Sequence, residues 1–71
     1  MTFKESVLYA IKRAHREKKD LVVGREDNRW EIRELADPKS DMLSPSIIVC
    51  GKGIKYPEHE TLYAALVAQG A

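Results

Sequence analysis

This sequence has few sulfur-containing residues, no long apolar run and no large excess of positive or negative charge. The 71 residues include a single cysteine, Cys50, so no disulfide can close within the chain. One unpaired cysteine favours a reducing compartment, and residues 1–5 lack the apolar segment of a secretory signal peptide. No apolar run approaches the roughly 18 residues of a membrane span. The sequence therefore predicts a soluble, cytoplasmic protein with one domain, residues 1–71.

The charges nearly cancel. Twelve Lys and Arg residues against eleven Asp and Glu residues leave a formal net charge of +1, which argues against a dedicated binder of polyanions. The distribution is less even, because residues 1–33 hold nine basic and six acidic side chains, whereas residues 34–71 hold three and five. The basic excess gathers at residues 12–19, where it is typical of the solvated face of a helix or, alternatively, of a patch for an anionic partner.

Motifs for catalysis, metals or cofactors are absent as well. Gly51-Lys52-Gly53 has the glycines of a phosphate loop, but matches neither G-x-x-x-x-G-K-[ST] nor G-x-G-x-x-G, and is better explained as a turn at a strand end. His15, His59 and Cys50 are the only candidate bases or nucleophiles. No helical or strand spacing brings the three together, although the turn would let Cys50 and His59 approach. The sequence thus predicts a protein that is not an enzyme and holds no metal or cofactor.

Residues 3–19 have the pattern of an amphipathic helix. Thr2 and Glu5 are spaced as a capping box, in which each side chain bonds to the backbone amide of the other residue. Lys18 and Lys19 suit the carbonyl end of the helix dipole. The apolar stripe of this helix consists of Phe3, Val7, Ala10, Ile11 and Ala14.

Residues 21–35 are interpreted as two strands folded back on each other. Apolar and charged residues alternate through residues 29–33, which is the period of a strand with one buried face. Asp27-Asn28 tolerates the positive φ of a two-residue turn. This turn places Val23 opposite Ile32 and Arg25 opposite Trp30. The guanidinium of Arg25 then either forms a cation–π contact with the indole or covers the edge of the ring. The other face of the hairpin, which includes Val22, is expected to be mostly wet.

Two further elements complete the expected fold. Residues 47–50 form an apolar run that suits a strand covered on both sides, and Pro57 opens a second helix that Gly70 ends. The order helix, strand, strand, strand, helix predicts an α+β fold, with two helices packed on one face of a three-stranded antiparallel sheet. The expected core is Phe3, Val7, Ile11, Ala14, Val23, Trp30, Ile32, Ile47, Val49, Leu62, Ala65 and Leu66.

This order of elements resembles that of the double-stranded-RNA-binding domain. The resemblance covers topology only. That family places a lysine cluster at the start of its second helix to contact phosphates, where this chain has Pro57-Glu58-His59-Glu60. Because those two carboxylates would repel phosphates, the resemblance implies an arrangement of helices and strands and no RNA-binding site.

The longest loop, residues 36–46, is the first candidate for a functional surface. It contains two prolines, three serines and two aspartates, and its length exceeds the usual connection of roughly four to six residues. Its only sizeable apolar residues are Met42 and Leu43. They either tuck under the loop and pin it, or form an exposed apolar tip that meets a partner protein.

These observations favour a small non-catalytic accessory protein that works by binding another protein. An inhibitor of a host system, carried by a phage or mobile element, is one factor of this kind. The alternative is nucleic-acid binding through the basic face of the first helix and the hairpin, and the residues that would carry it are Lys12, Arg13, Arg16, Lys19 and Arg29.

Overall fold

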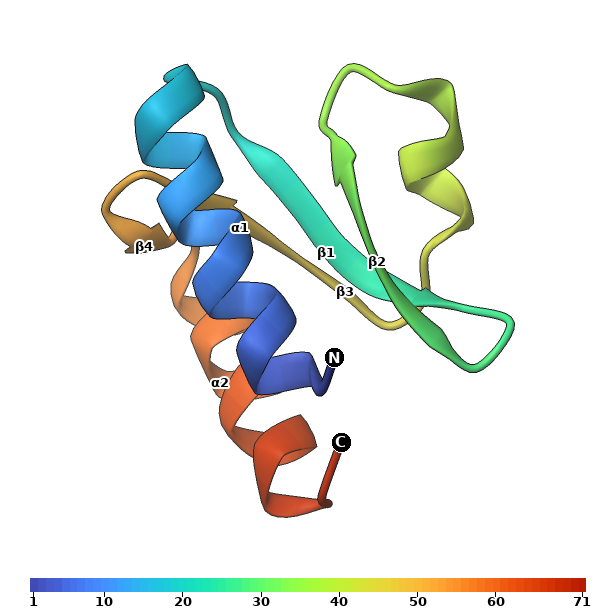
Figure 1. Ribbon diagram of the computed structural model, residues 1–71. Helices are drawn as coiled ribbons and strands as arrows, with labels where there is room; N and C mark the ends of the chain where they lie inside the picture. The colour runs from blue at the N-terminus through green and yellow to red at the C-terminus, as the bar shows by residue number, and fades with distance from the viewer.

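The computed structural model describes residues 1–71 as two α-helices, a short 3₁₀ helix and an antiparallel sheet (Figure 1). In chain order the elements are α1 (Phe3–Glu17), β1 (Leu21–Glu26), β2 (Arg29–Glu34), the 3₁₀ helix η1 (Pro38–Met42), β3 (Ser46–Cys50), β4 (Gly53–Ile54) and α2 (Pro57–Ala68). The predicted α+β class is confirmed. No helix is both long and apolar enough to cross a membrane.

The sheet has four strands in the order β2-β1-β3-β4, so the prediction of three strands was wrong. The fourth strand is the two-residue β4, which pairs Gly53 with Cys50 and Ile54 with Val49. Gly53 has a φ of 129°, a conformation that other residues rarely adopt. The Gly-Lys-Gly segment was correctly interpreted as a turn. Two paired residues after a turn are too short to leave a periodic pattern, which is why β4 was missed.

The hairpin has the predicted register. Val23 lies opposite Ile32 and Arg25 lies opposite Trp30. Asp27 and Asn28 form the turn with φ values of 52° and 64°, and the guanidinium carbon of Arg25 lies 5.8 Å from the centre of the indole. The third strand joins β1 rather than β2, with Val23 opposite Ile47 and Leu21 opposite Val49. β1 is therefore hydrogen-bonded along both of its edges.

Helix α1 begins as predicted and ends slightly earlier. Glu5 N–H donates to the Thr2 hydroxyl at 3.2 Å, and Thr2 N–H donates to the Glu5 carboxylate at 2.9 Å, which completes the capping box. Because the carboxylate accepts this bond, the pKa of Glu5 is lowered. Lys18 adopts the left-handed conformation at φ 56°, so the helix ends at Glu17 and not at residue 19.

The core lies between α1 and one face of the sheet. Alternate residues of β1 and β3 point towards the helix, as the period of two requires. The buried cluster consists of Phe3, Val7, Ala10, Ala14, Leu21, Val23, Ile47 and Val49. Six of these eight were predicted, and Ala10 and Leu21 were missed. Five predicted members are only partly buried, namely Ile11, Trp30, Ile32, Leu62 and Leu66, and Ala65 is exposed.

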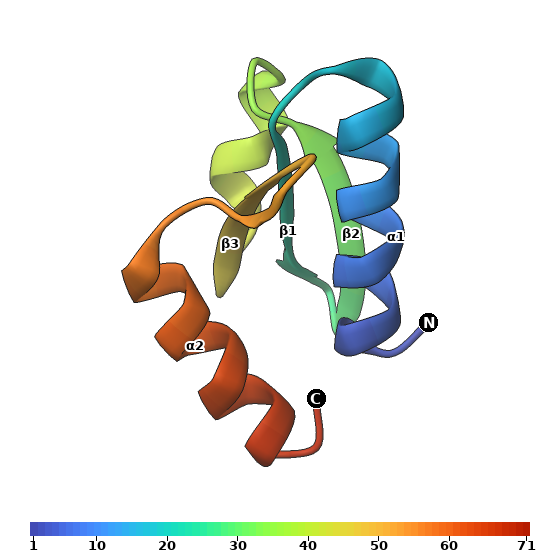
Figure 2. The same cartoon turned by 90° about the vertical axis from the view of Figure 1, so that its left-hand side faces the viewer.

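Helix α2 explains most of these differences. It contains no buried residue, and its main contacts are with β3, β4 and α1 rather than with the central strand (Figure 2). Tyr63 reaches the core edge, with its ring centre 5.5 Å from that of Phe3. The partly buried residues of α2 lie on one stripe, at positions 59, 62, 63, 66 and 67, and Ala64, Ala65 and Ala68 are exposed on the other side of the helix. Both helices therefore pack against the same core, but α1 covers it directly, whereas α2 lies at the β3–β4 side and is only partly buried.

The second face of the sheet is covered near its centre, contrary to the expectation that it would be mostly wet. Helix η1 lies on this side, opposite α1 (Figure 2). Val22 and Leu43 are each 4% exposed, and Ser40 is also buried. We call this the back face. The loop thus contributes a small second apolar layer, which a single alternating strand pattern could not reveal.

Burial predicts which isoleucine matters more for stability. Ile47→Ala removes a fully buried side chain and is expected to lower the free energy of unfolding by roughly 2–5 kcal/mol. Ile32→Ala should cost clearly less, because Ile32 is only partly buried. Urea unfolding followed by tryptophan fluorescence measures both values. Equal losses for the two variants would contradict the arrangement of the core.

Candidate functional site

A groove on the back face brings together residues from several elements of the fold. Its apolar residues are Val22, Leu35, Leu43 and Ile48, and its polar residues are Ser40, Asp41, Ser46 and His59. Its volume is about 260 Å³. These residues come from β1, the residue that follows β2, the η1 segment, β3 and the first turn of α2. We refer to this site as the back-face groove.

Gly24 allows the η1–β3 connection to rest directly on the central strand. A Cβ atom at residue 24 would lie 2.5 Å from the Cβ of Leu43 and 2.8 Å from the Cβ of Ser46. Contacts this short do not occur between real side chains, so only glycine fits. Arg25 N–H also donates to the Pro45 carbonyl at 3.1 Å. Leu43 is thereby pressed against β1 as one wall of the groove.

Arg33 anchors η1 to the hairpin. Its Nη1 donates to the Lys39 carbonyl at 2.7 Å, and its Nη2 donates to the Glu26 carboxylate at 2.7 Å. This hydrogen bond from Arg33 lowers the pKa of Glu26, and the same bond raises the pKa of Arg33. Asp37 caps the first turn of η1 by accepting from Lys39 N–H at 2.9 Å. The segment expected to be a loop is therefore held at several points.

His59 connects α2 to the sheet at the other end of the groove. Its Nδ1 accepts a hydrogen bond from the backbone N–H of Ile48 at 3.0 Å. Accepting at Nδ1 requires the neutral tautomer that carries its proton on Nε2. The ring of Tyr56 packs edge-on against the imidazole at 5.2 Å. The histidine serves here as an acceptor for the part of β3 that β4 does not cover, a role that sequence spacing does not reveal.

The two loop residues predicted to contact a partner have different environments. Leu43 is buried and lines the groove, so it pins the loop and is not part of an exposed tip. Met42 is 63% exposed and remains available at the surface. The side chains of successive residues at the end of η1 point in different directions, which separates the pair.

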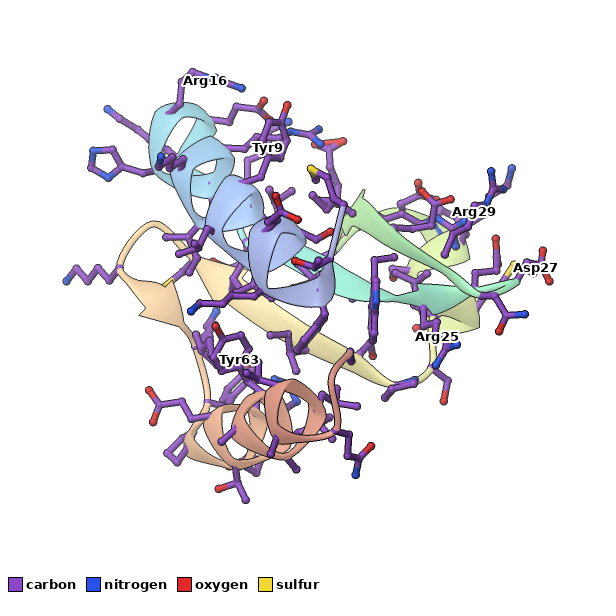
Figure 3. All side chains as sticks on the ribbon, turned by 60° about the horizontal axis from the view of Figure 1, so that its bottom comes forward. Tyr9, Arg16, Arg25, Asp27, Arg29 and Tyr63 are labelled. Carbon is purple, nitrogen blue, oxygen red and sulfur yellow. The ribbon has the colours of Figure 1, made fainter.

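The predicted nucleic-acid surface is partly neutralised, because three carboxylates pair with four of its five basic residues. Arg13 bonds to Glu17 at 3.0 Å, Arg16 lies 3.7 Å from Glu17, and Lys19 pairs with Glu34. Arg29 lies 3.9 Å from Glu31 at the hairpin tip, whereas Arg16 lies near the far end of α1 (Figure 3). Lys12 alone among the five forms no ion pair within 4 Å. The five residues do not form one continuous patch.

His15 and Cys50 line the same surface depression, which the spacing of the sequence did not indicate. The depression has a volume of about 540 Å³ and includes Lys18 and Lys52. The end of α1 packs against the β3–β4 turn, where a Cβ at Gly51 would lie 2.8 Å from the Cα of His15. No hydrogen bond joins the imidazole to the thiol. No group of three or more His, Cys, Asp or Glu residues is arranged to hold a metal ion.

A substitution at residue 24 tests how the groove is built. Gly24→Ala is expected to lower the free energy of unfolding by roughly 1–3 kcal/mol, because the new methyl group forces the η1–β3 connection off the strand. Urea unfolding measures the loss. In a Leu43→Gly background the closest clash is removed, so the same substitution should cost less. An equal or larger loss in that background would contradict the contact.

The Arg33–Glu26 pair predicts a pH dependence. The pKa of Glu26 lies below its ordinary value of 4.5 in the folded chain, so its ionised form favours folding. That contribution is complete above pH 4.5 and is lost as the pH falls through the lower folded value. Glu26→Gln should therefore lower Tm at pH 7, and the difference from the parent chain should shrink below pH 4.5. Glu31→Gln, which alters a looser pair, is the matched control and should show a smaller difference at pH 7.

The chain matches no protein-family model, no curated protein and no solved structure. The order of elements that resembles the double-stranded-RNA-binding domain is interrupted by η1 and β4. Glu58 and Glu60 in the first turn of α2 are both exposed, where that family presents lysines.

Proposed function

We propose that this chain is a non-catalytic accessory protein that binds another protein, and that the back-face groove receives one apolar side chain of that partner. The single observation that supports this proposal most strongly is the groove itself. Val22, Leu43 and Ile48 contribute apolar groups to its lining, beside the polar side chains of Ser40, Asp41, Ser46 and His59. A central anchor residue in a pocket of this kind is the usual source of affinity in protein interfaces.

The size of the groove favours a side chain over a cofactor. Sites for small molecules usually have volumes of roughly 300–1,000 Å³ and enclose most of the ligand. The back-face groove has a volume of about 260 Å³, below that range. Met42 lies beside it at the end of η1 and is 63% exposed, so it adds apolar contact area outside the groove. One aliphatic or aromatic anchor therefore fits this site best.

The charge around the groove indicates which residue of the partner lies next to the anchor. Asp41 lines the groove, is exposed and forms no ion pair within 4 Å. Glu58 and Glu60 are exposed in the first turn of α2, which also contributes His59 to the groove. A basic residue beside the anchor would complement these carboxylates. The proposed partner segment is thus an apolar residue adjacent to Lys or Arg.

Nucleic-acid binding is the weaker of the two functions predicted from the sequence. Arg13, Arg16 and Lys19 already have carboxylate partners, and displacing those partners would offset part of the gain from phosphate contacts. The hypothesis of a phage- or mobile-element-encoded inhibitor concerns the identity of the partner and stays a prediction.

Selection of random displayed peptides against the folded chain tests the proposal. The enriched peptides should share an apolar residue beside Lys or Arg, and their binding should shift the methyl resonances of Val22, Leu43 and Ile48. Asp41→Lys should weaken binding about tenfold or more, since it places like charges together at the groove. Lys12→Glu reverses a charge at an exposed position of α1, away from the groove, and should leave the affinity unchanged.

Two outcomes would count against the proposal. Enriched peptides that shift resonances elsewhere would place the binding surface outside the groove. Retardation of duplex RNA or DNA at low salt, lost on Lys12→Glu, would favour the alternative function.

A further inference from the structure

The two sides of the sheet differ in how many of their backbone groups the rest of the chain hydrogen-bonds. On the side of β3 away from β1, β4 pairs with Val49 and Cys50, and the backbone groups of Ile48 also have partners. The Ile48 carbonyl accepts from Lys55 N–H at 3.0 Å, and Ile48 N–H donates to His59 at 3.0 Å. The outer edge of β2 has no such cover, since β2 is the last strand of the sheet.

The register shows which backbone groups are left open. The N–H and C=O of Arg25 both bond towards the β3 side, to Pro45 and Ser44. Alternation along β1 then directs Val22, Gly24 and Glu26 towards β2, where they face Arg33, Glu31 and Arg29. The N–H and C=O groups of Trp30 and Ile32 must therefore point away from the sheet. No loop or side-chain group bonds to them.

An exposed strand edge normally has a feature, such as a proline or a bulge, that prevents it from pairing with another chain. β2 contains no proline, and each of its six residues pairs in sequence with one residue of β1, so no bulge interrupts it. Its back-face side chains alternate in sign, as Arg29, Glu31 and Arg33. This alternation does not repel a second strand of the same sequence.

We propose that β2 pairs antiparallel with β2 of a second copy of this chain, about a two-fold axis at Ile32. The two sheets then form one continuous eight-stranded sheet. In this register Glu31 of each copy faces Arg33 of the other, and Trp30 faces Glu34. The outward N–H and C=O groups of Trp30 and Ile32 and the N–H of Glu34 are open, whereas the Glu34 carbonyl already accepts from Asp37 N–H at 3.0 Å. In this register residues 30, 32 and 34 of the two copies meet as an antiparallel ladder requires. The proposal concerns a different surface from the back-face groove and does not depend on it.

Charge selects this register over its neighbours. An axis at Glu31 would set Glu31 against Glu31 and Arg29 against Arg33, and an axis at Arg33 would set Arg33 against Arg33. Like charges directly opposite each other destabilise a pair of strands. An axis at Trp30 would pair Ile32 with Asn28, which lies in the turn at φ 64° and cannot continue a strand.

The side chains beside the edge are compatible with a second copy. Glu31 has only one loose partner, Arg29 at 3.9 Å, so its carboxylate can turn towards Arg33 of the other chain, which keeps its own bonds to Glu26 and the Lys39 carbonyl. On the α1 face, two partly buried Ile32 side chains would meet at the axis. Tyr9 projects from α1 and is 50% exposed, which leaves a ring available to cover them (Figure 3).

Cysteine cross-linking in a Cys50→Ser background tests the register. Residues that face each other at a non-hydrogen-bonded position have Cα atoms about 4.5 Å apart, which suits a disulfide. A mixture of Glu31→Cys and Arg33→Cys chains should cross-link on mild oxidation, whereas neither variant alone should do so. No cross-link in the mixture, or cross-linking of one variant alone, would overturn the register.

Sedimentation over a range of concentrations tests the dimer without any new thiol. The parent chain should associate, and Glu31→Arg should raise the dissociation constant about tenfold by creating two like-charged pairs. Glu60→Arg makes the same change of charge on exposed α2 and should leave association unaltered. Equal Tm values at low concentration show that both variants fold. A parent chain that stays monomeric at about 1 mM overturns the proposal.

Discussion

The central strand β1 is the constraint on which the other elements depend. It hydrogen-bonds to β2 on one side and to β3 on the other, and its first four residues are all buried. Leu21 and Val23 face α1, while Val22 and Gly24 face the η1 segment. Because β1 is covered on both faces and paired on both edges, it fixes where α1, the η1 segment, β2 and β3 can lie. Such a strand is unusual in a chain of 71 residues, where little material is available to cover a second face.

The back face is covered because the connection between β2 and β3 lies close against the sheet and is held there by polar contacts. Gly24 removes the side chain that would hold this connection away from the sheet. Arg33 then binds the Lys39 carbonyl and the Glu26 carboxylate together, so one guanidinium fixes the hairpin and η1. A segment composed of prolines, serines and aspartates thereby becomes a wall of a groove. Its order comes from contacts with distant residues rather than from its own secondary structure.

Ion pairs decide what the basic residues offer to a partner. Several basic side chains form ion pairs within the chain, including Lys19 with Glu34 and Lys55 with Asp20. These pairs join the end of α1 to the hairpin and the β3–β4 region to the start of β1. They are partly exposed, so each contributes little to stability. Their larger effect is to cancel the field that a basic stretch of sequence would otherwise produce.

The sequence by itself determined the features that depend on near neighbours in the chain. The capping box of α1, the two-residue turn and the hairpin register follow from local spacing, and so does the face of α1 that is buried. Tertiary structure decided what depends on residues far apart. These features are the pairing of β3 with β1, the two-residue strand β4, the edge position of α2 and the burial of Leu43 beneath η1. The Met42–Leu43 pair was found from composition, but only the close approach at Gly24 determined that one residue lines the groove and the other stays exposed. The physical reason is that local backbone preferences are encoded within a few residues, whereas the covering of a face is set by which distant segment can reach it.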